Sequence, residues 1–171
     1  MIVVSNSSPL IHLSRIGLLN LLPKLFGSVH ISQQVYEEVA VDGLGEPGSQ
    51  EVTEAQWIIR EDVELEGAMQ FPSNLGIGEV TSILLAQRLK SDWLILDDGQ
   101  ARKAAVRIGL QVIGCVGVLE RAFQRRDLDD LRGAYASLLH TRAYVSLALV
   151  NAALQRSGLP PLDESRWSLT P

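Results

Sequence analysis

The stretch that decides the fold is residues 93–114, which read WLILDDGQARKAAVRIGLQVIG. Its apolar start, Trp93–Leu96, has the length and composition of a short buried strand. Apolar residues then recur at helical spacing over residues 99–108, and Gly109 is typical of a helix end. Gln111–Ile113 predicts another strand. A strand, a helix and a strand in succession predict one unit of a parallel sheet.

The same alternation continues on both sides of this unit. Further strands are predicted at Ile2–Val4, Val29–Ile31 and Trp57–Ile59, and further helices from Pro9, over 32–41, over 76–90 and over 115–126. The expected fold class is therefore α/β, with a parallel sheet flanked by helices on both faces. Two more helices, near 128–140 and 143–157, follow without strands. We expect an α/β domain over 1–126, a C-terminal helical extension over 127–160 and a tail over 161–171.

Length and composition fit one globular domain with a helical extension. The chain has 171 residues, of which 46% are hydrophobic and 20% charged, so it can bury a substantial core. Its single cysteine, Cys115, cannot form an intramolecular disulfide and cannot build a thiolate zinc site alone. Residues 1–6 lack the features of a signal peptide, and no apolar run approaches the ~20 residues of a membrane span. We expect a soluble, cytoplasmic protein with no membrane partner.

The charge is unevenly distributed along the chain. The net charge of −5 divides into −9 over residues 1–100 and +4 over residues 101–171. Six basic residues and one acid lie between Arg102 and Arg126. Such asymmetry is consistent with a metal site beside a phosphate-binding rim, and equally with the solvated faces of ordinary amphipathic helices.

Acidic and amide side chains lie where predicted strands end or helices begin. Asn6 follows the first strand, Glu38 lies on the helix after the second, and Glu79 lies in the first turn of the central helix. Asp97 and Asp98 end the strand that begins at Trp93. The carboxyl ends of parallel strands share one edge of a sheet, so these side chains could line one cleft. Clustered oxygen ligands favour Mg²⁺ or Mn²⁺, which can polarise a phosphodiester and activate water.

Each of these residues also has an ordinary structural explanation. Asn6 and Asp98 are good helix caps, and Glu79 near a helix start gains from the helix dipole without any function. The three histidines are far apart in the sequence and have no i,i+4 spacing, so we interpret them as structural or surface residues; they are His12, His30 and His140. The glycines match neither a P-loop nor a dinucleotide fingerprint.

Several short segments together resemble a known family. The opening, Ile2–Ile11 (IVVSNSSPLI), resembles the first strand of PIN-domain proteins, in which the strand ends in Asp followed by Ser or Thr. Val35–Val39 (VYEEV), Gly76–Val80 (GIGEV) and Leu94–Arg102 (LILDDGQAR) are similar to the segments that carry the family's other acids. The resemblance covers about residues 2–157 and is nearest to the branch related to VapC toxins, often labelled a domain of unknown function.

The resemblance implies a metal-dependent ribonuclease that holds Mg²⁺ or Mn²⁺. The implied acids are Glu38, Glu79 and Asp98, with Asp97 as an alternate or helper, and Asn6 occupies the position of the family's first Asp. From their positions in the sequence, Ser8 is expected to support Asn6 by a hydrogen bond, and Arg102 and Lys103, just after the acids, are placed to meet RNA phosphate. Toxin members imply a small antitoxin protein as partner, and the family implies a homodimer.

Asn6 leaves the activity open, because an amide offers a metal an oxygen but no charge. The first hypothesis is a divalent-metal ribonuclease, the toxin of a toxin–antitoxin pair. The second is a catalytically weak or inactive PIN-like scaffold that binds RNA or a protein. A third is an α/β phosphohydrolase that uses Asp97 or Asp98 as nucleophile.

Overall fold

The computed structural model describes residues 1–141, 143 and 145–163. The strands form one parallel sheet in the order β3-β2-β1-β4-β5. Their bounds are β1 Val3–Ser5, β2 Val29–Ser32, β3 Ile58–Glu61, β4 Trp93–Ile95 and β5 Val112–Ile113. Strand β1 is central, and the chain passes from it first to β2 on one side and later to β4 on the other. This reversal creates a switch point at the carboxyl ends of β1 and β4, where α/β proteins place their sites.

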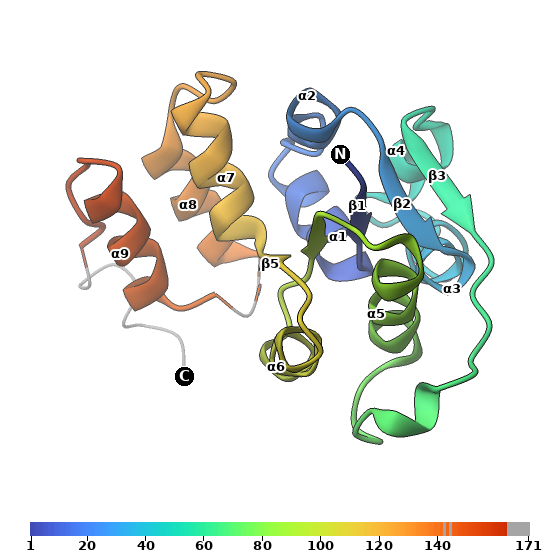
Figure 1. The fold of residues 1–171 in the computed structure, drawn as a ribbon. Coiled ribbons are helices and arrows are strands. Elements are labelled where there is room, and N and C mark those ends of the chain that lie inside the picture. The colour runs from blue at the N-terminus through green and yellow to red at the C-terminus, as the bar shows by residue number, and fades with distance from the viewer. Residues whose placement is uncertain (142, 144, 164–171) are drawn as a thin grey trace.

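Helices cover both faces of the sheet (Figure 1). Their bounds are α1 Ser7–Arg15, α2 Leu21–Phe26, α3 Gln33–Tyr36, α4 Ser49–Glu54, α5 Ile77–Leu89, α6 Gly99–Arg107, α7 Cys115–Gln124, α8 Leu131–His140 and α9 Leu147–Arg156. A π-helical segment, η1 (Glu37–Val41), continues α3, and a short 3₁₀ helix, η2, spans Ala68–Gln70. The predicted α/β fold class is confirmed, with elements close to the expected bounds.

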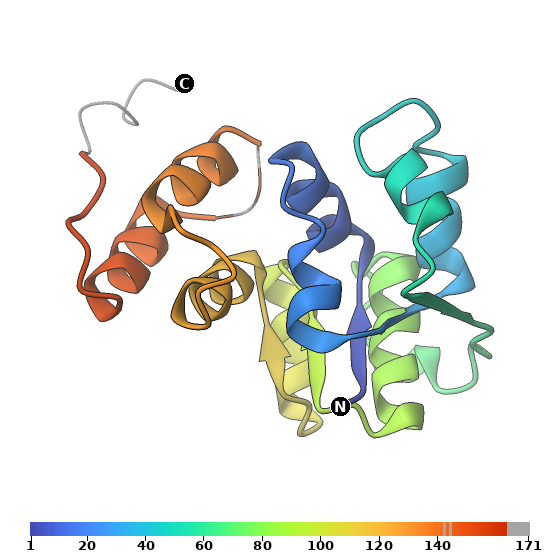
Figure 2. The ribbon, with the colours of Figure 1, turned by 90° about the horizontal axis from the view of Figure 1, so that it is seen from above.

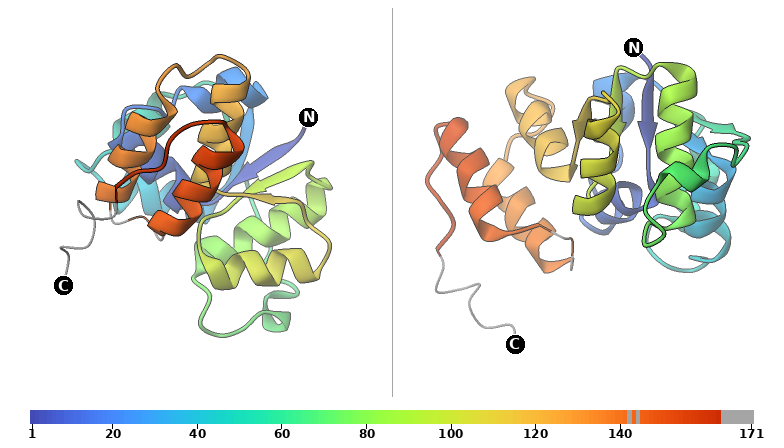
Figure 3. Two further views of the ribbon diagram at one scale, coloured as in Figure 1. Left: turned by 90° about the vertical axis from the view of Figure 1, so that its left-hand side faces the viewer. Right: turned by 60° about the horizontal axis from the view of Figure 1, so that its bottom comes forward.

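The central strands β1 and β4 are largely buried on both faces, and their side chains alternate between two cores. Val3 and Ile95 face a core built with α1, α2 and α7, whereas Val4 and Leu94 face a core built with α5 and α6. Figure 3 shows α5 and α6 together on the same side of the sheet. Burial on both faces explains why the strands are short runs of β-branched and aliphatic residues without polar alternation.

Helices α8 and α9 extend the first core beyond the sheet. They pack on α7, and Figure 2 shows them on the side of α7 away from β2 and β3. Buried Tyr135 on α8 donates a hydrogen bond from its hydroxyl to the carbonyl of Val116, at 2.9 Å. Helix α9 begins at Leu147, four residues later than predicted, because the Ser146 side chain caps it through the Leu149 N–H. The domain division at residues 126 and 160 stays a prediction, and residues 164–171 of the predicted tail lie outside the described residues.

Candidate functional site

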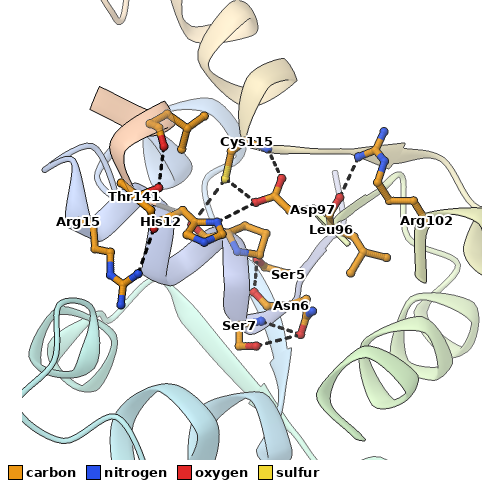
Figure 4. Close-up of polar contacts among 12 residues, drawn as sticks. Ser5, Asn6, Ser7, His12, Arg15, Leu96, Asp97, Arg102, Cys115 and Thr141 are labelled. Atoms are coloured by element: carbon orange, nitrogen blue, oxygen red, sulfur yellow. Dashed lines mark hydrogen bonds and ion pairs between the residues drawn. The ribbon is translucent and has the colours of Figure 1, made fainter. Parts of the chain in front are cut away.

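Asn6 lies at the switch point, directly after β1. Its backbone N–H donates to the carbonyl of Ile95 at 3.0 Å, which joins the ends of β1 and β4. Its side-chain oxygen accepts from the N–H of Ser7 at 2.7 Å and from the Ser7 hydroxyl at 3.2 Å, so Asn6 caps α1 (Figure 4). The residue is 1% exposed. The serine that bonds to the Asn6 side chain is therefore Ser7. Within the described part of the chain, Ser8 makes no hydrogen bond to the Asn6 side chain.

Glu38 is held at the N-terminal end of α5. It lies on the π-helical segment η1, a type of distortion that is frequent at functional sites. One of its carboxylate oxygens accepts a hydrogen bond from the N–H of Gly78 at 3.1 Å. A Cβ atom on Gly78 would lie 2.5 Å from both oxygens of this carboxylate. Glycine at position 78 therefore makes the close approach of Glu38 possible.

Glu79 lies in the first turn of the same helix. One carboxylate oxygen accepts from the N–H of Gly76 at 2.9 Å, which closes the N-terminal turn of α5. Burial raises the pKa of Glu79, the Gly76 hydrogen bond opposes this, and the charges of Asp98 and Glu38 raise the pKa further. The carboxylates of Asp98 and Glu38 therefore each lie close enough to Glu79 for their charges to act on it.

Asp98 caps helix α6. One of its carboxylate oxygens accepts from the N–H groups of Gln100 and Ala101, each at 2.8 Å. A helix cap accounts for this geometry without any further function. The second oxygen makes no hydrogen bond within the described residues, and the same holds for the second oxygens of Glu38 and Glu79. Each of the three carboxylates thus retains one oxygen for a ligand.

Asp97 is held by a different set of residues. Its carboxylate accepts from the N–H of Cys115 at 2.8 Å and from the Cys115 thiol at 2.9 Å, and it contacts Nδ1 of His12 at 3.3 Å (Figure 4). The Asp97 side chain is only 4% exposed. Burial by itself would raise the pKa of Asp97, but hydrogen bonds from His12 and Cys115 outweigh it and lower the pKa. Both oxygens are therefore engaged, and this position does not suit a nucleophile.

The cluster of His12, Asp97 and Cys115 has no clear signal in the sequence. His12 and Asp97 are 85 residues apart, so no local spacing pattern connects them. The topology brings them together, because α1 follows β1 and α7 follows β5 at the same end of the sheet. His12 is buried rather than on the surface, and its carboxylate and thiol neighbours follow only from the fold.

The two predicted RNA-contacting residues differ in their surroundings. The Arg102 guanidinium donates to the carbonyl of Leu96 at 2.8 Å and is partly buried. It lies near Gly114, where a Cβ atom would come within 2.9 Å of Nη1. Lys103 is exposed on α6. Arg102 therefore supports the end of β4, and Lys103 is the free cation of this pair.

The donor chemistry of Glu38, Glu79, Asp98 and Asn6 fits a hard divalent cation. All four offer oxygen, and the three carboxylates supply the negative charge that Mg²⁺ or Mn²⁺ requires. Their carboxylate oxygens do not form a group of three within 4.8 Å of one another; among the described residues, that condition is met by His12, Asp97 and Cys115. Binding one ion between the acids would therefore require side-chain rotation toward a common centre.

Comparison with known proteins identifies the fold family. A family model described as "PIN domain" matches residues 2–159. A search of curated proteins finds no match. Among solved structures, the chain is similar to a PilT N-terminus domain protein from the hyperthermophilic archaeon Sulfolobus solfataricus P2, with 16% identity and a TM-score of 0.48 over 85% of this chain and 100% of that one.

The match covers the whole sheet, the three acids and the C-terminal helices as far as residue 159. PIN domains have a nuclease-type fold and generally use divalent metal ions. No helix in the described part of the chain is long and apolar enough to cross a membrane. The predicted resemblance is confirmed: the chain belongs to the PIN-domain family.

Proposed function

We propose that the protein is a divalent-metal-dependent ribonuclease of the PIN type. The observation that carries the proposal is the Glu79 carboxylate, whose pKa is raised first by burial and further by the neighbouring charges of Asp98 and Glu38. Like charges held together at the carboxyl end of a parallel sheet are stabilised by a bound cation. Helix capping alone does not require Asp98 and Glu38 to lie near Glu79.

The three acids and the Asn6 side-chain oxygen would hold Mg²⁺ or Mn²⁺. When bound, the ion would polarise a phosphodiester and lower the pKa of an attacking water. Gly78 would keep Glu38 close to the start of α5, and Asp98 would present its free oxygen from the start of α6. Exposed Lys103, on α6 after Asp98, would contact the RNA backbone, and Arg102, held at the Leu96 carbonyl, would add positive charge beside it.

The test is cleavage of a labelled single-stranded RNA by the purified chain with Mn²⁺, with Mg²⁺ and with EDTA. We expect cleavage only with a divalent ion, and loss of about 100-fold or more in Glu79→Gln, because a group that holds the ion is removed. Glu37→Gln is the matched control, since Glu37 is an exposed neighbour of Glu38 that bonds to Gln33. Equal cleavage by both variants would reject the proposal.

We further propose that this ribonuclease acts as the toxin of a toxin–antitoxin pair and forms a homodimer. The support is the PIN family and the resemblance of its motifs to the VapC-related branch. Expression of the chain should stop growth, and co-expression of a small protein encoded beside it should restore growth. Growth arrest that survives in Glu79→Gln would contradict a nuclease toxin. Light scattering of the purified chain measures the oligomeric state.

A second candidate function is a catalytically weak or inactive scaffold that binds RNA or a protein. Asn6 favours it, because the family's first carboxylate is replaced by an amide whose oxygen already accepts two hydrogen bonds from Ser7. Under this reading Asn6→Asp does not raise cleavage and Glu79→Gln does not lower it, while RNA binding persists in both variants.

A further inference from the structure

Three metal-ligating side chains of different chemistry meet beside the proposed acidic site. His12 comes from α1, Asp97 follows β4, and Cys115 opens α7. Their ligand atoms all lie within 4.8 Å of one another. The side chains of His12 and Asp97 are 10% and 4% exposed, and Cys115 is fully buried. A nitrogen, an oxygen and a sulfur donor thus converge from separate segments of the chain.

The separations approach those found around one tetrahedral ion. Zinc binds nitrogen and oxygen at roughly 2.0–2.1 Å and sulfur at roughly 2.3 Å, so neighbouring ligands lie roughly 3.3–3.5 Å apart. Nδ1 of His12 is 3.3 Å from the Asp97 oxygen, which already fits. The Cys115 sulfur is 2.9 Å from the same oxygen and would move outward by about half an ångström to admit the ion. The carbonyl oxygen of Pro9, 3.9 Å from that sulfur, offers a further ligand atom for the ion.

We propose that His12, Asp97 and Cys115 form a second metal centre, for an ion of the zinc class. The donor set separates it from the oxygen-only group of Glu38, Glu79 and Asp98, because thiolate and imidazole favour Zn²⁺ or Co²⁺ over Mg²⁺. On binding, the Cys115 thiol releases its proton to solvent, and the imidazole binds through Nδ1 with its own proton on Nε2. The thiolate and the Asp97 carboxylate then balance the two charges of the ion.

The role that this centre would fill is structural. The ion would link α1, the segment after β4 and α7, and would fix Asp97 next to Asp98. Without an ion, the Asp97 carboxylate accepts hydrogen bonds from the Cys115 N–H and thiol and contacts His12. The three residues can therefore also form a hydrogen-bonded tie between these segments that needs no metal. That tie is the alternative that the experiment must separate from a metal centre. The proposal does not depend on nuclease activity.

The test is titration of the full chain with Co²⁺, followed by absorption spectroscopy. Thiolate ligation gives a sulfur-to-cobalt charge-transfer band in the near ultraviolet, which oxygen ligands do not give. Because Cys115 is the only cysteine, a band at one equivalent of Co²⁺ identifies this centre. We expect the band to survive excess Mg²⁺ and the Glu79→Gln substitution, and to disappear in Cys115→Ser.

His12→Gln provides a second variant that keeps the thiol. Loss of groups that merely support a metal ligand costs about 10–100-fold in affinity, so losing the imidazole should weaken Co²⁺ binding at least about tenfold. Co²⁺ bound without the band, no binding at all, or unchanged affinity in His12→Gln would each overturn the proposal and leave the hydrogen-bonded tie.

Discussion

The carboxylate of Glu38 lies against the backbone of Gly78, 40 residues later in the chain. The Gly78 N–H donates to this carboxylate at 3.1 Å, and a Cβ atom on Gly78 would lie 2.5 Å from both of its oxygens. Glycine costs stability inside a helix, and position 78 is the second residue of α5. Gly78 therefore lowers the stability of the helix but leaves room for the Glu38 carboxylate.

The first prediction concerns Gly78→Ala. The added methyl group should displace the Glu38 carboxylate and lower Mn²⁺-dependent cleavage by about 100-fold, because small misplacements of catalytic groups carry costs of this size. The free energy of unfolding should change by less than about 1 kcal/mol, because improved helix propensity offsets the lost hydrogen bond. Gly99→Ala is the matched control, since a Cβ on Gly99 in the first turn of α6 meets no atom within 4 Å. Equal activity in the two variants would contradict the prediction.

The second prediction concerns the stability of Glu79→Gln as a function of pH. The pKa of Glu79 is raised mainly by burial and, after the opposing Gly76 hydrogen bond, by Asp98 and Glu38. The folded state therefore binds this proton more tightly than the unfolded state, so the stability from protonated Glu79 is present at low pH. It is lost as pH rises from the ordinary glutamate pKa through the raised one.

Glu79→Gln should accordingly raise the thermal midpoint at neutral pH in EDTA, and the gain should vanish below the ordinary glutamate pKa. The glutamine side chain can still accept the Gly76 N–H, so the helix start is retained. Added Mn²⁺ should stabilise the native chain more than the variant. A variant that is less stable than the native chain at neutral pH would show that Glu79 acts only as a cap.

Much of the fold follows directly from the sequence, because every strand includes at least two aliphatic residues that stand out from their polar surroundings. Trp93–Ile95 and Val29–Ser32 are two of these strands, and both lie where predicted. The π-helical segment at Glu37–Val41 was not foreseen, since its apolar spacing is that of an ordinary helix. Motif order singles out Glu38, Glu79 and Asp98, and their role as a metal site stays a prediction. The partners of Asp97 could not be predicted, because His12 and Cys115 approach it only through the fold.

The third prediction concerns Asn6→Asp. An aspartate can accept the same hydrogen bonds from Ser7, so the cap of α1 should persist. The new charge at the switch point should strengthen Mn²⁺ binding and raise cleavage at least about tenfold, because carboxylates bind hard cations better than amides. Asn20→Asp is the control: Asn20 precedes α2 and makes no capping hydrogen bond through its side chain. Cleavage that does not rise in Asn6→Asp would favour the scaffold.

The last prediction separates Arg102 from Lys103. Arg102→Gln removes the donor to the Leu96 carbonyl and should lower the free energy of unfolding by about 1–2 kcal/mol. Lys103→Gln should change the free energy of unfolding by less than about 0.5 kcal/mol, since Lys103 is exposed. It should also reduce by about one the slope of the logarithm of the RNA-binding constant against the logarithm of the salt concentration. Lys24→Gln, an exposed lysine on α2 before β2, is the control and should change neither quantity. The measurements are urea unfolding and RNA binding over a salt series, and equal slopes for Lys103→Gln and Lys24→Gln would remove Lys103 from the RNA-binding surface.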